Sequence, residues 1–152
     1  MKIWIDADAS PREAKDIVFR AAVRLQVETV LVANQPLRTP VGNPLVSFVL
    51  VPGGPDVADR HIVDHAEAGD LVITQDIPLA ALLVPKQIVV LDPRGDEHTS
   101  ETIGERLSLR DFMEHMRSVG EVTSGPAPYD ARAKRAFSSA LDRVLTRLLR
   151  SR

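Results

Sequence analysis

Five short runs rich in valine, isoleucine and leucine recur along this chain. They cover residues 2–6, 28–33, 46–51, 70–74 and 87–91. Several lack the alternation of apolar and polar residues that a half-exposed strand shows, which favours strands buried on both faces, as in a parallel sheet. Stretches with helical periodicity lie between them, at 11–25, 56–66 and 77–83. This order predicts an α/β fold with a central, mainly parallel sheet of about five strands and right-handed crossovers.

The last part of the chain predicts three further helices, over residues 101–106, 108–118 and 130–150. A breaker sequence, TSGPAP, precedes the last helix. Apolar residues recur in that helix at intervals of three and four and form one face; they are Ala133, Ala136, Phe137, Ala140, Leu141, Val144, Leu145 and Leu148. We therefore predict a single three-layer domain over residues 1–152, with helix 130–150 docked on it through this face.

Composition excludes several kinds of site and indicates a compartment. The chain has no cysteine, which rules out disulfides, thiolate metal sites and cysteine nucleophiles. Its apolar start is too short for a signal peptide, and no window approaches the length of a membrane span. We expect a cytoplasmic protein that does not associate with membranes.

Charge is distributed unevenly along the chain, whose net charge is −2. Residues 131–152 contain seven lysines and arginines but one aspartate, a net charge of +6, which leaves −8 for the first 130 residues. A basic helix of this kind is usually a solvated face. It can also attract the phosphates of a nucleic acid strand to the acidic body of the molecule.

Most of the expected strands are followed by aspartates. In an open α/β sheet, binding sites form beyond the carboxyl ends of the strands. The acids after the first, third, fourth and fifth strands are Asp6 and Asp8, Asp56 and Asp59, Asp76, and Asp92. Carboxylates two residues apart on an extended segment lie about 6.5 Å from each other and repel by roughly 2.5 kcal/mol. A divalent cation such as Mg²⁺ or Mn²⁺ bound by these oxygen atoms would offset the repulsion.

Each acid also has a structural interpretation. Asp8 can hydrogen bond to the following turn, Asp76 can cap the helix that starts at residue 77, and Asp59 can be an exposed helix residue. Ser10-Pro11-Arg12-Glu13 reads as a capping box with proline at the first helical position, so we assign Ser10 to helix capping rather than to nucleophilic catalysis. Because the acids gather at matching strand ends, we favour a shared site.

Several blocks of the sequence resemble the YaiI/YqxD family of bacterial proteins in order and spacing. They are IWIDADAS, VANQPLR, DVADRHIVDHAEAGDLVITQDIPLAA, LDPRG and LSLRDFM. The family is similar in outline to PIN-like domains, which are metal-dependent nucleases with a parallel sheet and a cluster of acids. Asp6, Asp59 and the motif Thr74-Gln75-Asp76 match the PIN pattern. Ser10 stands where the family usually has cysteine, which excludes thiol chemistry at this position.

The resemblance implies a PIN-like, divalent-metal-dependent nuclease that hydrolyses phosphodiesters, in RNA more than in DNA. The expected catalytic residues are Asp6, Asp8, Asp59 and Asp76, and the expected ligands of Mg²⁺ or Mn²⁺ are Asp6, Asp8, Asp56, Asp59 and Asp76. Residues after the second strand and in the Thr-x-Asp motif are expected to bind the substrate: Asn34, Arg38 and Thr74. Asn34 would orient a water molecule or a phosphate oxygen, and Arg38 would bind phosphate through two hydrogen bonds. Asn34 can equally serve the turn around Pro36, and Arg94, after the fifth strand, is similarly ambiguous.

Other interpretations stay open at this point. A domain that binds nucleic acid or a protein partner without catalysis could keep the same acids, and the chain could form a homo-oligomer. In a phosphotransferase of the haloacid dehalogenase type, Asp6 would be the nucleophile and Asp8 the proton carrier. That class also needs a lysine, and Lys86 comes late in the order of motifs. His61 and His65 share a helix face as in zinc hydrolases, but no third ligand is evident.

Overall fold

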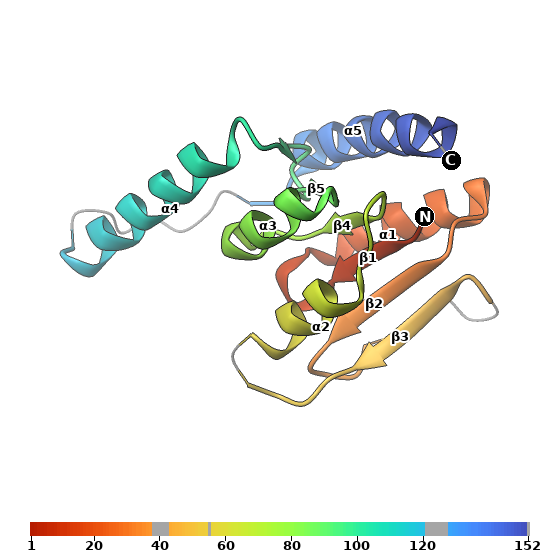
Figure 1. Cartoon of the computed structure of the whole chain (residues 1–152), viewed down its shortest axis with the longest axis horizontal. Coiled ribbons are helices and arrows are strands. Elements are labelled where there is room, and N and C mark those ends of the chain that lie inside the picture. The colour runs from red at the N-terminus through yellow and green to blue at the C-terminus, as the bar shows by residue number, and fades with distance from the viewer. Residues whose placement is uncertain (38–42, 55, 121–127, 152) are drawn as a thin grey trace.

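A six-stranded sheet forms the centre of the molecule, which we describe from a computed structural model covering residues 1–37, 43–54, 56–120 and 128–151 (Figure 1). The strands are β1 (Ile3–Asp6), β2 (Thr29–Ala33), β3 (Val46–Leu50), β4 (Leu71–Ile73), β5 (Val89–Leu91) and β6 (Glu97–His98). Their order is β3-β2-β1-β4-β5-β6, and every neighbouring pair is parallel except β5 and β6. The mainly parallel sheet is confirmed, and the five predicted strands lie where the apolar runs placed them.

Helices cover both faces of this sheet, which confirms the three-layer α/β architecture. They are α1 (Arg12–Leu25), α2 (Val57–His65), α3 (Ile77–Leu83), α4 (Ile103–Ser118) and α5 (Ala131–Arg150), with short 3-10 turns at Ala7–Ala9 and Val84–Lys86. One core packs α1 and α5 against one face, and a second core packs α2 and α3 against the other. No helix in these described ranges is long and apolar enough to cross a membrane.

The two cores explain why the strands read as continuous apolar runs. All four residues of β1 are buried, with Ile3 and Ile5 in the core beneath α1 and α5 and Trp4 in the core beneath α2 and α3. Successive side chains of a strand point to opposite faces, so a strand covered on both faces needs apolar residues at every position. Phe137, fully buried, anchors α5 in the first core.

Three features differ from the prediction. The antiparallel strand β6 was not predicted, because two residues are too few to show a pattern. Helix α4 is continuous from Ile103 to Ser118, whereas two helices were predicted; no proline follows Ser108, and its backbone continues the helix. The predicted Ser10 cap is wrong: Pro11 occupies the N-cap of α1, and the Ser10 hydroxyl donates a hydrogen bond to the carbonyl of Asp6 (2.9 Å).

The strand order reverses at the centre of the sheet. The chain moves outward from β1 to β2 and β3 on one side, then crosses back to place β4 and β5 on the other. At such a reversal the two neighbouring connections leave in opposite directions, which opens a crevice beyond the carboxyl ends of the central strands. Here that crevice lies beyond β1 and β4.

A buried acid holds the opposite edge of the sheet together. Asp70, 6% exposed, accepts hydrogen bonds from the backbone N–H of Lys2 (2.9 Å), the indole N–H of Trp4 (3.1 Å) and the backbone N–H of Glu67 (2.9 Å). These bonds join the start of β1 to the start of β4. Asp70 is therefore a structural acid, with its oxygen atoms already bonded to donors of the protein.

We expect Asp70→Ala to lower the free energy of unfolding by about 2–4 kcal/mol, because three buried or part-buried donors lose a charged acceptor. Denaturant unfolding followed by the fluorescence of Trp4, the single tryptophan, measures this change. Asp64→Ala, at an exposed position of α2, is the matched control and should change stability by less than about 0.5 kcal/mol. Equal stability of the two variants would contradict the role of Asp70.

Candidate metal centre

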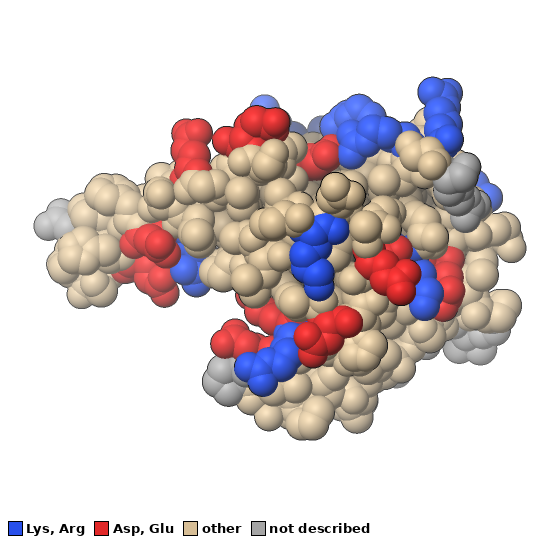
Figure 2. All heavy atoms as spheres, viewed as in Figure 1, with Lys and Arg blue, Asp and Glu red and all other residues tan. Residues whose placement is uncertain are grey.

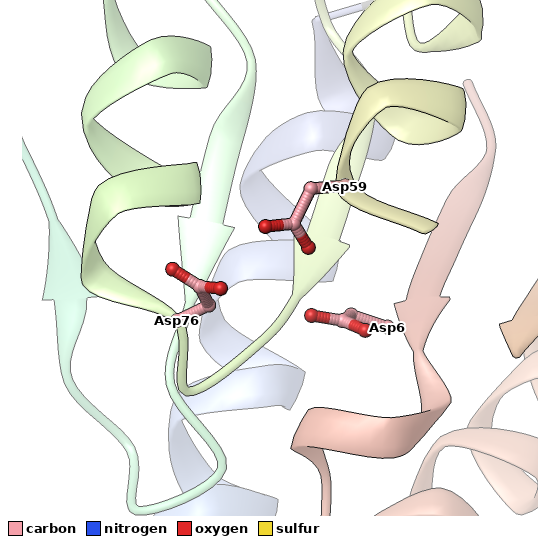
Figure 3. A group of neighbouring side chains, drawn as sticks. All are labelled: Asp6, Asp59 and Asp76. Atoms are coloured by element: carbon pink, nitrogen blue, oxygen red, sulfur yellow. The ribbon is translucent and has the colours of Figure 1, made fainter. Parts of the chain in front are cut away.

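Three carboxylates from three elements meet at the crevice. Asp6 is the last residue of β1, Asp59 lies in the first turn of α2, and Asp76 immediately precedes α3. One oxygen atom from each lies within 4.8 Å of one from each of the others. Figure 3 shows the three side chains pointing toward one another. The chain thus brings together residues that are 53 and 70 positions apart, as the strand-end rule predicts.

Asp6 is held by a neighbouring strand. Its side chain is 3% exposed, and one oxygen, Oδ2, accepts a hydrogen bond from the hydroxyl of Thr74 (2.8 Å). The same hydroxyl accepts a bond from the backbone N–H of Asp76 (3.0 Å). Thr74 therefore links two of the three acids, Asp6 and Asp76, and fixes their relative positions.

Asp76 stands at the start of α3 and faces the other two acids. Its Oδ1 atom accepts a hydrogen bond from the backbone N–H of Leu79 (3.0 Å), so it caps α3, as predicted. Its side chain also faces Asp59, with which it shares a hydrogen bond. Hydrogen bonds from the protein to a carboxylate are the arrangement that orients a metal ligand.

Burial and neighbouring charges raise the pKa values of Asp59 and Asp6. Burial first, and then the charges of Asp76 and Asp6, raise the pKa of Asp59 to about 7. A hydrogen bond between Asp59 and Asp76 also raises the pKa of Asp59, since the bond requires a proton on one of them. Burial likewise raises the pKa of Asp6 to about 6, against the lowering effect of the Thr74 hydroxyl.

A surface hollow of about 190 Å³ opens onto the three acids. Its lining also includes the small residues Ala9, Ala58 and Gly54, whose side chains offered no chemical signal in the sequence. Among the residues that the structure describes, the lining is Asp6, Asp8, Ala9, Asn34, Gly54, Asp56, Ala58, Asp59 and Asp76. Five of these nine residues are aspartates and none is a lysine or arginine, so this lining is strongly acidic.

Asp8 and Asp56 lie at the mouth of this hollow. Asp8 is exposed, and its Oδ2 atom accepts a hydrogen bond from the backbone N–H of Asn34 (3.0 Å). Asp8 therefore accepts a hydrogen bond from the residue that follows β2. The sequence had suggested a bond to the turn that follows Asp8 itself. Asp56, also exposed, has a left-handed backbone (φ 63°) at the start of α2, and its charge adds to the pKa rise of Asp59. Both acids stand outside the group of three.

The structure places two of the three residues expected to bind the substrate. Asn34 is exposed and lines the hollow. Thr74 is fully buried with its hydroxyl bonded to Asp6 and Asp76, so it positions the acids and is not accessible to a substrate, which corrects its expected role. Arg38 lies outside the described residues.

Two other acids and the charged turn after β5 have no part in the hollow. Asp92 accepts a hydrogen bond from the backbone N–H of Arg94 (2.7 Å) in the turn that leads to β6. The Arg94 guanidinium lies 5.9 Å from the centre of the Tyr129 ring. Asp64 is exposed on α2. Position after a strand therefore did not by itself identify a residue of the site.

The donor set of the three acids fits a divalent cation. All the ligand atoms are carboxylate oxygens, which suits Mg²⁺ or Mn²⁺ rather than metals that prefer nitrogen or sulfur. Asp59 and Asp76 lie close enough to share a proton in a hydrogen bond, and a cation at that position would replace the proton. Asp6, Asp59 and Asp76 would hold it, with Asp8 and Asp56 at the mouth.

Neither alternative centre gains support from the geometry. His61 and His65 stack on each other with ring centres 4.1 Å apart, and His65 Nδ1 lies 2.8 Å from the carbonyl of His61. Across residues 1–37, 43–54, 56–120 and 128–151, they join no group of three metal-binding side chains. Lys86 donates to the carbonyl of Val63 (2.6 Å) and does not line the hollow, where a phosphotransferase would need it.

The raised pKa values predict how stability depends on pH. In the folded protein Asp6 and Asp59 keep their protons up to about pH 6 and 7, whereas the unfolded chain loses them near the ordinary value of 3.8. The folded state therefore binds more protons between these limits. The stabilisation that these bound protons give the folded state is fully present below about pH 4 and is lost as pH rises to about 7.

We expect Asp59→Asn to raise the free energy of unfolding of the metal-free protein by about 1–2 kcal/mol at pH 8, because it removes a charge that the folded state disfavours. At pH 4 the variant and the wild type should be equally stable. Denaturant unfolding in a chelating buffer at both values measures the difference, with Asp64→Asn as the control on the same helix. A variant less stable than wild type at pH 8 would show that the acids do not repel.

Comparisons with known proteins agree with the sequence motifs. The family model described as "Uncharacterized BCR, YaiI/YqxD family" matches residues 4–147. A UPF0178 protein of Myxococcus xanthus is 55% identical over 151 residues, covering 99% of this chain and 98% of its own. A UPF0178 protein of Bordetella petrii is 57% identical over 145 residues, covering 95% of this chain and 96% of its own.

A solved structure also matches: that of the yeast methylglyoxal/isovaleraldehyde reductase Gre2 complexed with NADPH, at 14% identity and a TM-score of 0.40. The match covers 80% of this chain and 52% of that one. This likeness is too low to support a conclusion about fold or function. The match to the family model and the identity to the UPF0178 proteins extend over nearly the whole chain, which therefore belongs to the YaiI/YqxD family.

Proposed function

We propose that this protein is a divalent-metal-dependent nuclease that hydrolyses phosphodiester bonds in RNA or other single-stranded nucleic acid. The observation that carries the proposal is the convergence of Asp6, Asp59 and Asp76 at the crevice of a parallel sheet. Clustered carboxylates that must share a proton favour a cation, and phosphodiester hydrolysis is a reaction that such a cation assists. The resemblance to PIN-like domains supports the same class of reaction.

The bound Mg²⁺ or Mn²⁺ would polarise the phosphate and lower the pKa of a water molecule. Other residues of the chain hold the acidic side chains in position. Thr74 keeps Asp6 and Asp76 at a fixed separation, and the N–H of Leu79 fixes the rotation of the Asp76 carboxylate. The two acids are thus set before any ligand binds, which lowers the cost of forming the reactive arrangement.

Asp8 and Asn34 would act on the substrate side of the hollow. The hydrogen bond between the Asn34 N–H and Asp8 Oδ2 leaves the second carboxylate oxygen of Asp8 to accept a proton or to bind a second cation. The exposed side-chain amide of Asn34 would donate to a phosphate oxygen. Both residues lie on the same edge as the buried acids, at the ends of neighbouring strands.

We expect the wild type to bind Mn²⁺, and Asp59→Asn and Asp76→Asn each to weaken binding by about 10- to 100-fold, because each removes a charged ligand. Isothermal titration calorimetry at pH 8 measures the dissociation constants. Asn caps helices as well as Asp does, so Asp76→Asn should keep α3 intact. Asp64→Asn should bind as wild type does. Absence of binding by the wild type would refute the metal centre.

We expect the wild type to cleave single-stranded RNA in the presence of Mn²⁺ or Mg²⁺, and Asp59→Asn to lower kcat by at least about 100-fold, because the reactive water loses its activating cation. A fluorescently labelled oligonucleotide of mixed sequence serves as the substrate. Retention of RNA by the wild type without cleavage, in the presence of bound metal, would instead identify a non-catalytic binding domain. A trapped phosphate ester on Asp6 would identify a phosphotransferase.

The basic face of α5 would hold the distant part of the strand. Arg143, Arg147 and Arg150 line a second surface hollow in the later half of the helix, where Figure 2 shows basic side chains gathered above the body. Arg147 is already paired with Glu97 (2.8 Å). Arg143 and Arg150 form no ion pair in the part of the chain that the structure describes. They are free to contact phosphates.

We expect the double variant Arg143→Gln/Arg150→Gln to bind single-stranded RNA less tightly and with weaker salt dependence. Losing two phosphate contacts should reduce the slope of log K against log salt by about 1.4, at about 0.7 for each contact. Fluorescence anisotropy across a series of salt concentrations measures the slope. Arg117→Gln, an exposed arginine of α4, is the control and should leave the slope unchanged. An unchanged slope in the double variant would exclude the basic face of α5.

A further inference from the structure

Helix α4 is anchored to the body by its first turns. Its 16 residues include none that is buried, although α1, α2, α3 and α5 each bury at least one residue. Ile103 packs against the core beneath α2 and α3, and α4 contacts α3. Figure 1 shows the later turns extending beyond α3 as an arm. A helix of this length is marginal in water unless another surface covers its apolar side.

The arm has an apolar stripe of its own, formed by Leu109, Phe112, Met113, Met116 and Val119. Leu109, Phe112 and Val119 are 60%, 56% and 55% exposed, among the highest values for large apolar residues in the described chain. At about 100° per residue, Leu109, Phe112, Met116 and Val119 lie on the side of the helix away from Ile103, and Met113 lies at the edge of the stripe. The described part of the body therefore leaves Leu109, Phe112 and Val119 exposed, whereas Met113 and Met116 between them are half-buried.

We propose that this stripe pairs with the same stripe of a second copy of the chain, in an antiparallel two-helix contact about a twofold axis. Leu109, Phe112, Met116 and Val119 follow one another at intervals of three, four and three, which is the seam spacing that accepts a partner helix. With the axis at the level of Glu114, Leu109 faces Val119 of the second copy and Phe112 faces its Met116. Each apolar residue of the seam then meets an apolar residue.

The charges of α4 favour its own copy over a strongly charged partner. The helix contains three arginines and three acids, so its side chains are balanced: Arg106, Arg110 and Arg117 against Glu105, Asp111 and Glu114. Arg110 pairs with Glu114 (3.1 Å), and Arg106 pairs with Asp96 (3.5 Å), within one molecule. Glu114 lies on the side away from the stripe, so the twofold contact brings no like charges together at its centre.

A twofold contact of this kind is closed, because each copy uses the same surface. It would give a dimer rather than a filament. In Figure 2 the free end of the arm shows mostly uncharged side chains on its visible face, with a patch of charged ones nearer the body. The inference concerns α4 alone and does not depend on the proposed nuclease activity, since α4 contributes no residue to the acidic hollow.

Sedimentation equilibrium of the full chain, over an about hundredfold range of concentration, tests the proposal. We expect the wild type to dimerise, and Phe112→Glu and Leu109→Glu each to raise the dissociation constant by at least about 100-fold. Both positions are exposed within one copy, so circular dichroism should show an unchanged fold. Val23→Glu, at a 51% exposed apolar position of α1, is the matched control and should dimerise as wild type does.

Introduced cysteines test the orientation, because the chain has none of its own. Under mild oxidation, a mixture of Leu109→Cys and Val119→Cys should give a disulfide between the two variants, and Leu109→Cys alone should give much less. A wild type that stays monomeric would overturn the proposal, as would a dimer that Phe112→Glu and Leu109→Glu leave intact. Efficient self-linking of Leu109→Cys would overturn the antiparallel arrangement.

Discussion

The hydrogen bond between Thr74 and Asp6 joins the two central strands at the point where the order of the sheet reverses. Both groups are buried, so neither could be left without a partner at low cost. The bond places the end of β4 beside the end of β1, and through the N–H of Asp76 it also places the start of α3. This bond sets the distance between the elements that carry Asp6 and Asp76, and Asp59 reaches the same crevice from α2.

The two edges of the sheet use buried aspartate in opposite ways. At the amino edge, Asp70 accepts three hydrogen bonds from donors of the protein, and its charge is compensated by them. At the carboxyl edge, burial and neighbouring charges raise the pKa values of Asp6 and Asp59, and Asp59 shares a hydrogen bond with Asp76. An acid compensated by donors of the protein stabilises the fold, whereas acids that face one another favour a cation between them.

Most of the fold could be predicted because strands buried on both faces leave a strong pattern in the sequence. Residues 3–6 and 29–33 are apolar at nearly every position for this reason. The strand β6 has two residues and leaves no such pattern. The cap at Ser10 was wrong because its hydroxyl has a tertiary alternative, the carbonyl of Asp6, which no local motif indicates.

The candidate site was predictable to the extent that it follows topology. The rule that strand ends meet at one edge correctly brought Asp6, Asp59 and Asp76 together. The rule could not exclude Asp92, whose side chain hydrogen bonds within the turn after β5. An acid that serves a turn follows its strand just as an acid of the site does. The rule also could not show that Thr74 faces the acids from inside the core, because that orientation depends on the register between β1 and β4.

The last helix of the chain covers the first strand. Phe137 and Leu141 of α5 share a core with Ile3 and Ile5 of β1, at a separation in sequence close to the whole length of the chain. Helix α1 packs in the same core, so β1 is fully enclosed on this face only when both helices are in place. Contacts between residues so distant in sequence require a long loop to close before they form. The strand that carries Asp6 therefore depends on some of the least local contacts of the fold, which slows folding relative to a fold built from neighbouring elements.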